Sequence, residues 1–102
     1  MSEYNVSFNM VFKNTDATEP LREYVDEKLT AAMQKFIHQD TNVHIKMEVE
    51  KHRQIAEATF NCFGTSFSAT EESENMYKSI DALVENVSKQ LRRHKEKMTK
   101  HH

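Results

Sequence analysis

The side chains with the clearest chemical potential lie near the end of the chain, where cations recur at helical spacing. Residues 89–102 contain one glutamate and six cations: Lys89, Arg92, Arg93, Lys95, Lys97 and Lys100. At 100° per residue, most of these cations share one side of a helix, opposite an apolar stripe that includes Val87 and Leu91. Successive charges lie about 5–6 Å apart along such a helix, a spacing comparable with that of phosphates along a nucleic-acid strand. The segment therefore predicts a helix that docks by one side and binds a polyanion by the other.

An earlier segment supplies a second group of cations. Lys28 and Lys35 lie on one flank of an apolar stripe, beside Tyr24, whereas the carboxylates of this segment occupy its outer face. If both lysines lean toward the basic helix, the two helices share one cationic surface. The alternative is a solvated helix face with local ion pairs, such as Glu85 with Lys89.

The distribution of charge is more informative than its sum. Fourteen basic and sixteen acidic residues give a net charge of −2, which by itself argues against a nucleic-acid binder, because such proteins usually carry a basic excess. Residues 1–50, however, hold five basic and nine acidic side chains, and residues 51–102 hold nine basic and seven acidic ones. The molecule is therefore predicted to be a charge dipole with its basic end at the last helix.

Enzymatic and metal chemistry find little support in the sequence. The single glycine, Gly64, excludes a glycine-rich phosphate loop, and the single cysteine, Cys62, excludes a disulfide within the chain and a cysteine-clustered zinc site. Cys62 is in phase with apolar residues of a predicted strand, which favours a buried structural thiol. His38 and His44 match no standard ligand spacing, and His94 lies on the apolar side of its helix. We expect no enzyme, no metal and no cofactor.

Two amphipathic helices are predicted. The first spans about residues 19–37, with Thr18 as its N-cap and Pro20 in its first turn, where a missing N–H costs little. The second spans about residues 74–98, with Ser73 as its cap. Apolar residues recur in both at spacings of three and four, which is typical of helices packed on a core.

Alternation of apolar and polar residues predicts four strands, over about 4–12, 43–49, 56–62 and 65–69. Short connections join the last three, so they are expected to form an antiparallel meander. The predicted fold class is therefore α+β in the order β-α-β-β-β-α, with two helices packed on one face of a four-stranded sheet. The α-β-β-β-α part has the element order of a double-stranded RNA-binding domain.

The length of 102 residues predicts a single domain with one modest core. We expect this domain to span residues 1–102, with about 99–102 as a flexible tail. No apolar run approaches the roughly 20 residues that span a bilayer, and the first residues lack the pattern of a signal peptide. The expected compartment is the cytoplasm, and the expected free form is a monomer with no membrane partner.

Several short motifs follow one another along the chain: TEPLREYV at 18–25, VEKHR at 49–53, IAEATF at 55–60, NMYKSID at 75–81 and KQLRRHKEK at 89–97. In order and spacing they resemble the ribosome hibernation promoting factors, also called ribosome-associated inhibitors of translation. The resemblance covers nearly the whole chain. It agrees with the predicted element order, because the family fold is also β-α-β-β-β-α.

The resemblance implies binding to the small ribosomal subunit between its head and body, over the sites of transfer RNA and messenger RNA. Translation would be blocked by occupancy. Six cations are implied to contact ribosomal RNA: Arg22, Lys28, Lys89, Arg93, Lys95 and Lys97. Weaker candidates are Lys35, Lys51, Arg53, Lys78, Arg92 and Lys100. Tyr77 and Asp81 are expected to be structural.

Short members of this family act with a separate ribosome modulation factor to pair ribosomes into inactive dimers, whereas longer-tailed members keep ribosomes as single inactive particles. The length of this chain favours the promotion of dimers, as part of a stress or stationary-phase response. Two alternatives stay open. One is a binding module for another structured RNA, and the other is an inhibitor that keeps ribosomes as single particles.

Overall fold

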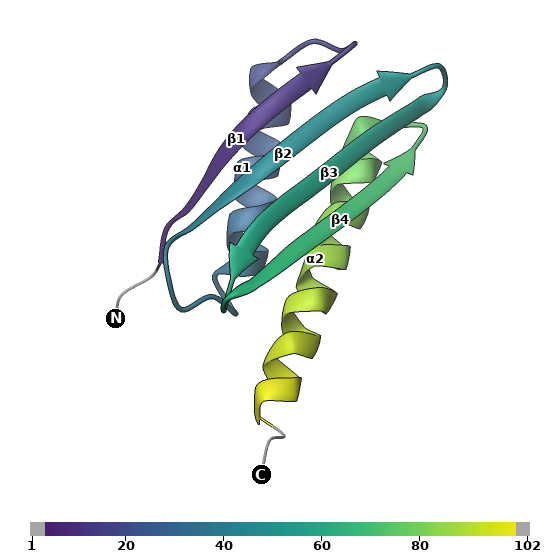
Figure 1. Cartoon of the computed structure of the whole chain (residues 1–102). Helices are drawn as coiled ribbons and strands as arrows, with labels where there is room; N and C mark the ends of the chain where they lie inside the picture. Colours follow the sequence, from purple (N-terminus) through teal and green to yellow (C-terminus); the bar gives the residue numbers. More distant parts are fainter. Residues whose placement is uncertain (1–3, 100–102) are drawn as a thin grey trace.

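The computed structural model describes the backbone of residues 4–99 and the side chains of residues 4–97. Six elements occur in the predicted order: β1 (Val6–Lys13), α1 (Glu19–Met33), β2 (Thr41–Glu50), β3 (Arg53–Cys62), β4 (Thr65–Ser73) and α2 (Met76–Thr99). The two helices lie side by side on one face of the sheet, and the last turns of α2 extend beyond its edge (Figure 1). Lys100 and most of the tail predicted at 99–102 lie outside the described residues.

The sheet has the strand order β1-β2-β3-β4. β1 pairs with β2 in parallel, because α1 carries the chain back across one face of the sheet before β2 begins. β2, β3 and β4 form the predicted antiparallel meander through two short turns, Lys51-His52 and Phe63-Gly64. Phe63 and Gly64 both have positive φ, 57° and 69°, as in the hairpin turns that match the twist of the strands.

The core lies between the sheet and the two helices. Alternate strand residues face it, such as Val43, Ile45 and Met47 of β2, which are at most 1% exposed. The helices contribute Val25, Leu29, Ile80, Leu83, Val87 and Leu91. The opposite face of the sheet is covered by no described element and carries mainly polar side chains. This arrangement leaves the outer sides of both helices exposed as well.

The first helix ends earlier than predicted. It begins at the predicted position, where Thr18 Oγ1 accepts a hydrogen bond from the backbone N–H of Leu21 at 3.3 Å, but it ends at Met33 rather than near residue 37. The backbone N–H of Ile37 still donates to the carbonyl of Met33 at 3.1 Å. This turn keeps Ile37 buried, which explains why the apolar spacing continues past the helix.

The N-cap of α2 is Asn75, not Ser73 as predicted. Asn75 Oδ1 accepts hydrogen bonds of 2.8 and 3.3 Å from two backbone N–H groups of the first turn. Ser73 is instead the last residue of β4, and its hydroxyl lies 2.8 Å from the buried hydroxyl of Ser79. The two serines therefore join the end of β4 to the start of α2.

Candidate nucleic-acid interface

Contacts along two of its sides fix the orientation of α2 about its own axis. Its core side is buried as far as Leu91. On the side toward β4, Asn86 Nδ2 donates to Glu71 Oε2 at 2.8 Å. One turn later, Gln90 Nε2 donates to the backbone carbonyl of Ser68 at 3.0 Å. These hydrogen bonds fix the rotation of α2 about its own axis. The side of the helix on which each later residue lies is therefore defined.

The cations of the second half of α2 surround its solvent side. Arg93 follows Asn86 by almost two turns and therefore lies toward β4. Lys95 follows Tyr77 by five turns and therefore lies toward α1, because Tyr77 packs edge-to-face on Tyr24 with ring centroids 4.9 Å apart. We call the complete set the cationic arc: Lys89, Arg92, Arg93, Lys95 and Lys97, all exposed.

Most of the cationic arc has no carboxylate partner within residues 4–97, whose side chains the structure describes. Lys89 Nζ lies 3.5 Å from Glu85 Oε1, the predicted i,i+4 pair, and such exposed pairs are weak. Among residues whose side chains the structure describes, Arg92, Arg93, Lys95 and Lys97 form no salt bridge. Their charges are therefore available to an external anion.

Lys28 places a further cation on the flank of α1 that faces the first turns of α2. Its ammonium group lies 5.6 Å from the ring centroid of Tyr24, and Tyr24 packs on the first turn of α2. The Tyr24 hydroxyl donates a 2.5 Å hydrogen bond to Asp81 Oδ1. This bond, which stabilises the neutral phenol, raises the pKa of Tyr24. Tyr77 and Asp81, which were expected to be structural, both contact Tyr24 and so connect α1 to α2.

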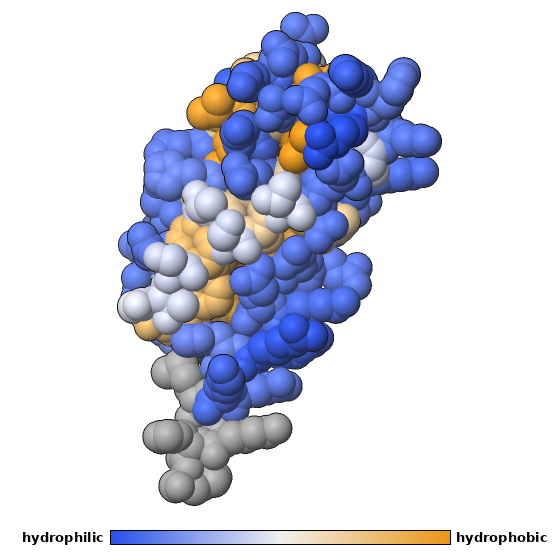
Figure 2. Space-filling view, turned by 45° about the vertical axis from the view of Figure 1, so that its right-hand side comes forward, coloured by the Kyte–Doolittle hydropathy of each residue, from blue (hydrophilic) through white to orange (hydrophobic). Residues whose placement is uncertain are grey.

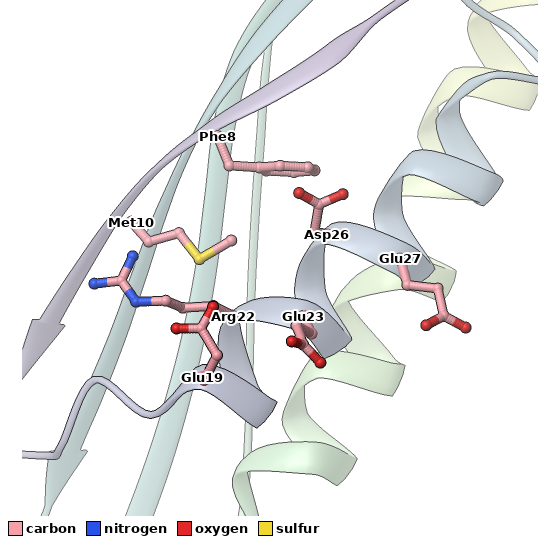
Figure 3. A pocket seen from close by; sticks show the side chains of 7 residues that line it. All are labelled: Phe8, Met10, Glu19, Arg22, Glu23, Asp26 and Glu27. Atoms are coloured by element: carbon pink, nitrogen blue, oxygen red, sulfur yellow. The ribbon is translucent and has the colours of Figure 1, made fainter.

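Arg22 lies on the other flank of the buried side of α1, toward β1, and does not join the cationic arc. Its guanidinium carbon is 5.3 Å from the ring centroid of Phe12 on β1. Arg22 lines a pocket of about 500 Å³ whose other residues are Phe8, Met10, Glu19, Glu23, Asp26 and Glu27. In Figure 3 its side chain extends alongside Met10, with Glu19 beside it and the other carboxylates further along α1. Because six residues on a helix turn through 600°, the side chains of Arg22 and Lys28 point about 120° apart, on the two flanks of the buried side of α1.

The weaker candidates are spread over the molecule. Lys51 is exposed in the β2–β3 turn, and Lys35 is exposed just after α1. Lys78 lies in the first turn of α2, eleven residues and about 16 Å before Lys89. Arg53 is held on the open face of the sheet by two carboxylates, at 2.6 Å from Glu72 and 2.9 Å from Glu50. This guanidinium lowers the pKa of Glu72 through its hydrogen bond.

Cys62 and the possible metal ligands were the groups considered for catalysis or metal binding. Cys62 is 1% exposed, as predicted, and burial raises the pKa of its thiol. Among the described residues, no three His, Cys, Asp or Glu side chains are grouped so that they could hold a metal ion. Within residues 4–99, neither helix combines the length and apolar character needed to cross a membrane.

An aromatic cluster beside the cationic arc is not apparent from the sequence. The ring of His94, half-buried as expected, stacks on Phe63 with centroids 5.2 Å apart and meets Phe67 edge-on at 5.5 Å. Phe67 and His94 line a pocket together with Arg93 and Lys97. Phe63 and His94 are 31 residues apart in the chain, so no local spacing could have revealed their contact.

Comparison with known proteins gives consistent relatives. A family model described as "Sigma 54 modulation protein / S30EA ribosomal protein" matches residues 8–99. A ribosome hibernation promoting factor of Pseudomonas putida is 43% identical over 87% of this chain and 86% of its own length. One from Escherichia coli is 31% identical over 94% of this chain and 100% of its own length.

Solved structures show the same architecture. A ribosomal subunit interface protein from Coxiella burnetii superposes with a TM-score of 0.79 at 28% identity, over 88% of this chain and 98% of that one. The N-terminal domain of protein Y from Thermus thermophilus gives 0.78 at 21% identity, over 87% and 97%, and supports the fold alone. The chain therefore belongs to the Sigma 54 modulation protein / S30EA ribosomal protein family, which includes the ribosome hibernation promoting factors.

Proposed function

We propose that this chain binds the small ribosomal subunit in the channel used by transfer RNA and messenger RNA, blocks translation there, and promotes or stabilises inactive ribosome dimers. The observation that carries the proposal is the cationic arc, in which four of five side chains have no carboxylate partner among the described residues. The family membership supplies the ribosome as the polyanion. A ribosomal target places the protein in the cytoplasm.

Binding would be driven largely by the release of counterions from ribosomal RNA. Each phosphate that a lysine or arginine neutralises releases condensed cations, so affinity falls as salt concentration rises. The helical rise spaces the arc so that several phosphates are engaged together. We assign the main contacts to the cationic arc and Lys28. Arg22 and Arg53 lie on other surfaces, and Arg53 would first have to leave Glu50 and Glu72.

The first experiment measures binding to purified small subunits by co-sedimentation. Arg93→Gln/Lys97→Gln removes two charges from the arc. Lys13→Gln/Lys46→Gln removes two charges from the open face of the sheet, where both lysines lie within 3.8 Å of Glu48. The arc variant should bind roughly 25- to 60-fold more weakly at 0.1 M salt, with a salt slope smaller by about 1.4–1.8. Equal losses in the two variants would show that the binding surface is wrongly assigned.

A sucrose-gradient profile tests what the bound protein does to ribosomes. Added protein, with and without a ribosome modulation factor, should move ribosomes from single particles into dimers. Bound protein that leaves ribosomes as single inactive particles would support the alternative inhibitor role. If bulk duplex RNA displaced the protein as well as unlabelled small subunits do, the target would instead be structured RNA in general.

A further inference from the structure

The pocket beside the end of α2 combines an aromatic floor with a cationic rim. It has a volume of about 470 Å³ and is lined by Phe67, Gln90, Arg93, His94, Glu96 and Lys97. This volume lies within the range of about 300–1,000 Å³ found for small-molecule sites. Figure 2 shows apolar surface next to strongly hydrophilic side chains on the lower half of this side of the molecule. The pocket therefore offers both a surface for a flat ring and charges for an anion.

The floor of the pocket is held rigidly. The ring of His94 is fixed by stacking on Phe63 and by its edge contact with Phe67, and Phe67 stacks on Phe60 with centroids 5.1 Å apart. Phe63 adopts φ 57°, a left-handed conformation that is rare for a bulky side chain. Its ring also lies 6.0 Å from the ring of His38. A strained backbone at Phe63 thus places an aromatic platform directly behind His94.

The rim of the pocket favours a phosphate that is attached to a base. Arg93 and Lys97 lie at i and i+4 on the same side of α2, about 6 Å apart, where their like charges repel each other. A phosphate between them would relieve that repulsion. Glu96 also lines the pocket, and its charge weakens the attraction for a small anion. Stacking of a base on the aromatic floor supplies binding free energy that the small net charge of the rim does not, because every base has a π-face.

We propose that this pocket holds one unstacked nucleotide of single-stranded RNA, with its base against His94 and Phe67 and its phosphate between Arg93 and Lys97. The inference rests on the proposed function, since it places one ribosomal RNA nucleotide at an end of the RNA-binding surface. The base contributes shape and stacking, and the two cations fix the backbone beside it.

The first test observes the pocket directly, without ribosomes. Side-chain NMR spectra of the full chain are recorded with hexa-adenylate and, separately, with inorganic phosphate. Hexa-adenylate should shift the ring signals of His94 and Phe67 together with the side-chain signals of Arg93 and Lys97. Inorganic phosphate should shift the two cations alone. If both ligands shifted the same signals, or hexa-adenylate left the rings unchanged, the pocket would not be a nucleotide site.

The second test measures small-subunit affinity in variants of the floor. His94→Ala should weaken binding roughly 5- to 150-fold, which is the range for loss of one stacked base, and should leave the salt slope nearly unchanged because Arg93 and Lys97 are both retained. His94→Phe keeps a ring against Phe63 and should restore most of the affinity. His44→Ala, on the exposed open face of the sheet, is the matched control and should bind like the parent chain.

The outcomes separate the two proposals. If the parent chain fails to bind small subunits, the proposed function is wrong, and hexa-adenylate still tests the pocket. If the parent chain binds with a steep salt dependence and His94→Ala binds equally well, the nucleotide pocket alone is wrong. A folded His94→Ala variant that loses affinity, with recovery in His94→Phe, supports the pocket, because phenylalanine restores an aromatic ring and adds no charge.

Discussion

Two surfaces of this molecule carry cations, but they use them in opposite ways. On the open face of the sheet, Lys13 and Lys46 lie 3.8 and 3.7 Å from Glu48, and Arg53 is clamped between Glu50 and Glu72. On α2, the cationic arc has a carboxylate partner at Lys89 alone among the described residues. The two surfaces belong to one chain of 102 residues with a net charge of −2.

This difference shows why net charge is a poor guide to the partner. A cation in a close carboxylate pair, such as Arg53, must exchange one anion for another when it binds a phosphate, so little binding free energy is gained. A cation without such a partner gains the whole interaction and releases the counterions of the nucleic acid. A polyanion-binding surface is therefore distinguished by cations that form no local salt bridges and lie on an element of fixed orientation, rather than by the number of basic residues.

The largest effect should come from reversing charge within the cationic arc. Arg92→Glu/Lys95→Glu changes the flank toward α1, and Arg93→Glu/Lys97→Glu changes the flank toward β4. Because neither flank forms a salt bridge in the part of the chain that the structure describes, each variant should bind small subunits more than about 50-fold more weakly at 0.1 M salt. The measurement is the co-sedimentation titration described above.

The two flanks also test the extent of the RNA-binding surface. If one pair of reversals left the affinity unchanged, RNA would contact only the other flank of the arc. The absence of a salt bridge would then not be sufficient to identify a cation that contacts RNA. The reversals should leave the unfolding transition nearly unchanged, because all four side chains are exposed.

The sequence predicted the parts of this architecture that depend on local periodicity. Apolar spacing assigned both helices and their buried sides, and alternation assigned the strands. Periodicity carries no information about which strands are neighbours, so the parallel pairing of β1 with β2 follows from the crossover and not from a motif. The cap was misassigned because Ser73 and Asn75 are both good capping residues, and the choice depends on Ser73 belonging to β4.

The candidate site was also predicted only in part, because local periodicity can be read from the sequence and tertiary neighbours cannot. Helical angles correctly placed the cations of α2 opposite its apolar stripe. The pairing of Arg53 was missed because the predicted fourth strand ended at residue 69, whereas β4 continues to Ser73 and brings Glu72 beside Arg53. The contact between Phe63 and His94 depends on where α2 crosses the β3–β4 turn, which is a property of tertiary packing alone.

A smaller effect should follow from releasing the paired cations of the sheet. Glu48→Gln/Glu72→Gln removes two carboxylates and changes the formal net charge from −2 to 0. Lys13, Lys46 and Arg53 then lose a partner but remain on the face opposite α2. Charges further apart than about 8 Å are largely screened at physiological salt, so small-subunit affinity should change less than about threefold. A gain as large as the loss in the arc variants would mean that the open face also contacts RNA.

The smallest effect concerns stability in acid, where the two surfaces should again differ. The guanidinium of Arg53 lowers the pKa of Glu72 in the folded chain, so folding favours the ionised carboxylate. The stabilisation is therefore present above the ordinary glutamate pKa and is lost as pH falls through the lowered, folded-state value. Urea unfolding from pH 7 to pH 3 should show a shallower loss of stability in Glu72→Gln than in the parent chain.

The control is Lys95→Gln, which removes a cation without a carboxylate partner among the described residues. Its loss of stability between pH 7 and pH 3 should equal that of the parent chain. A change in that variant equal to the change in Glu72→Gln would show that α2 is paired in solution and would remove the distinction between the two surfaces.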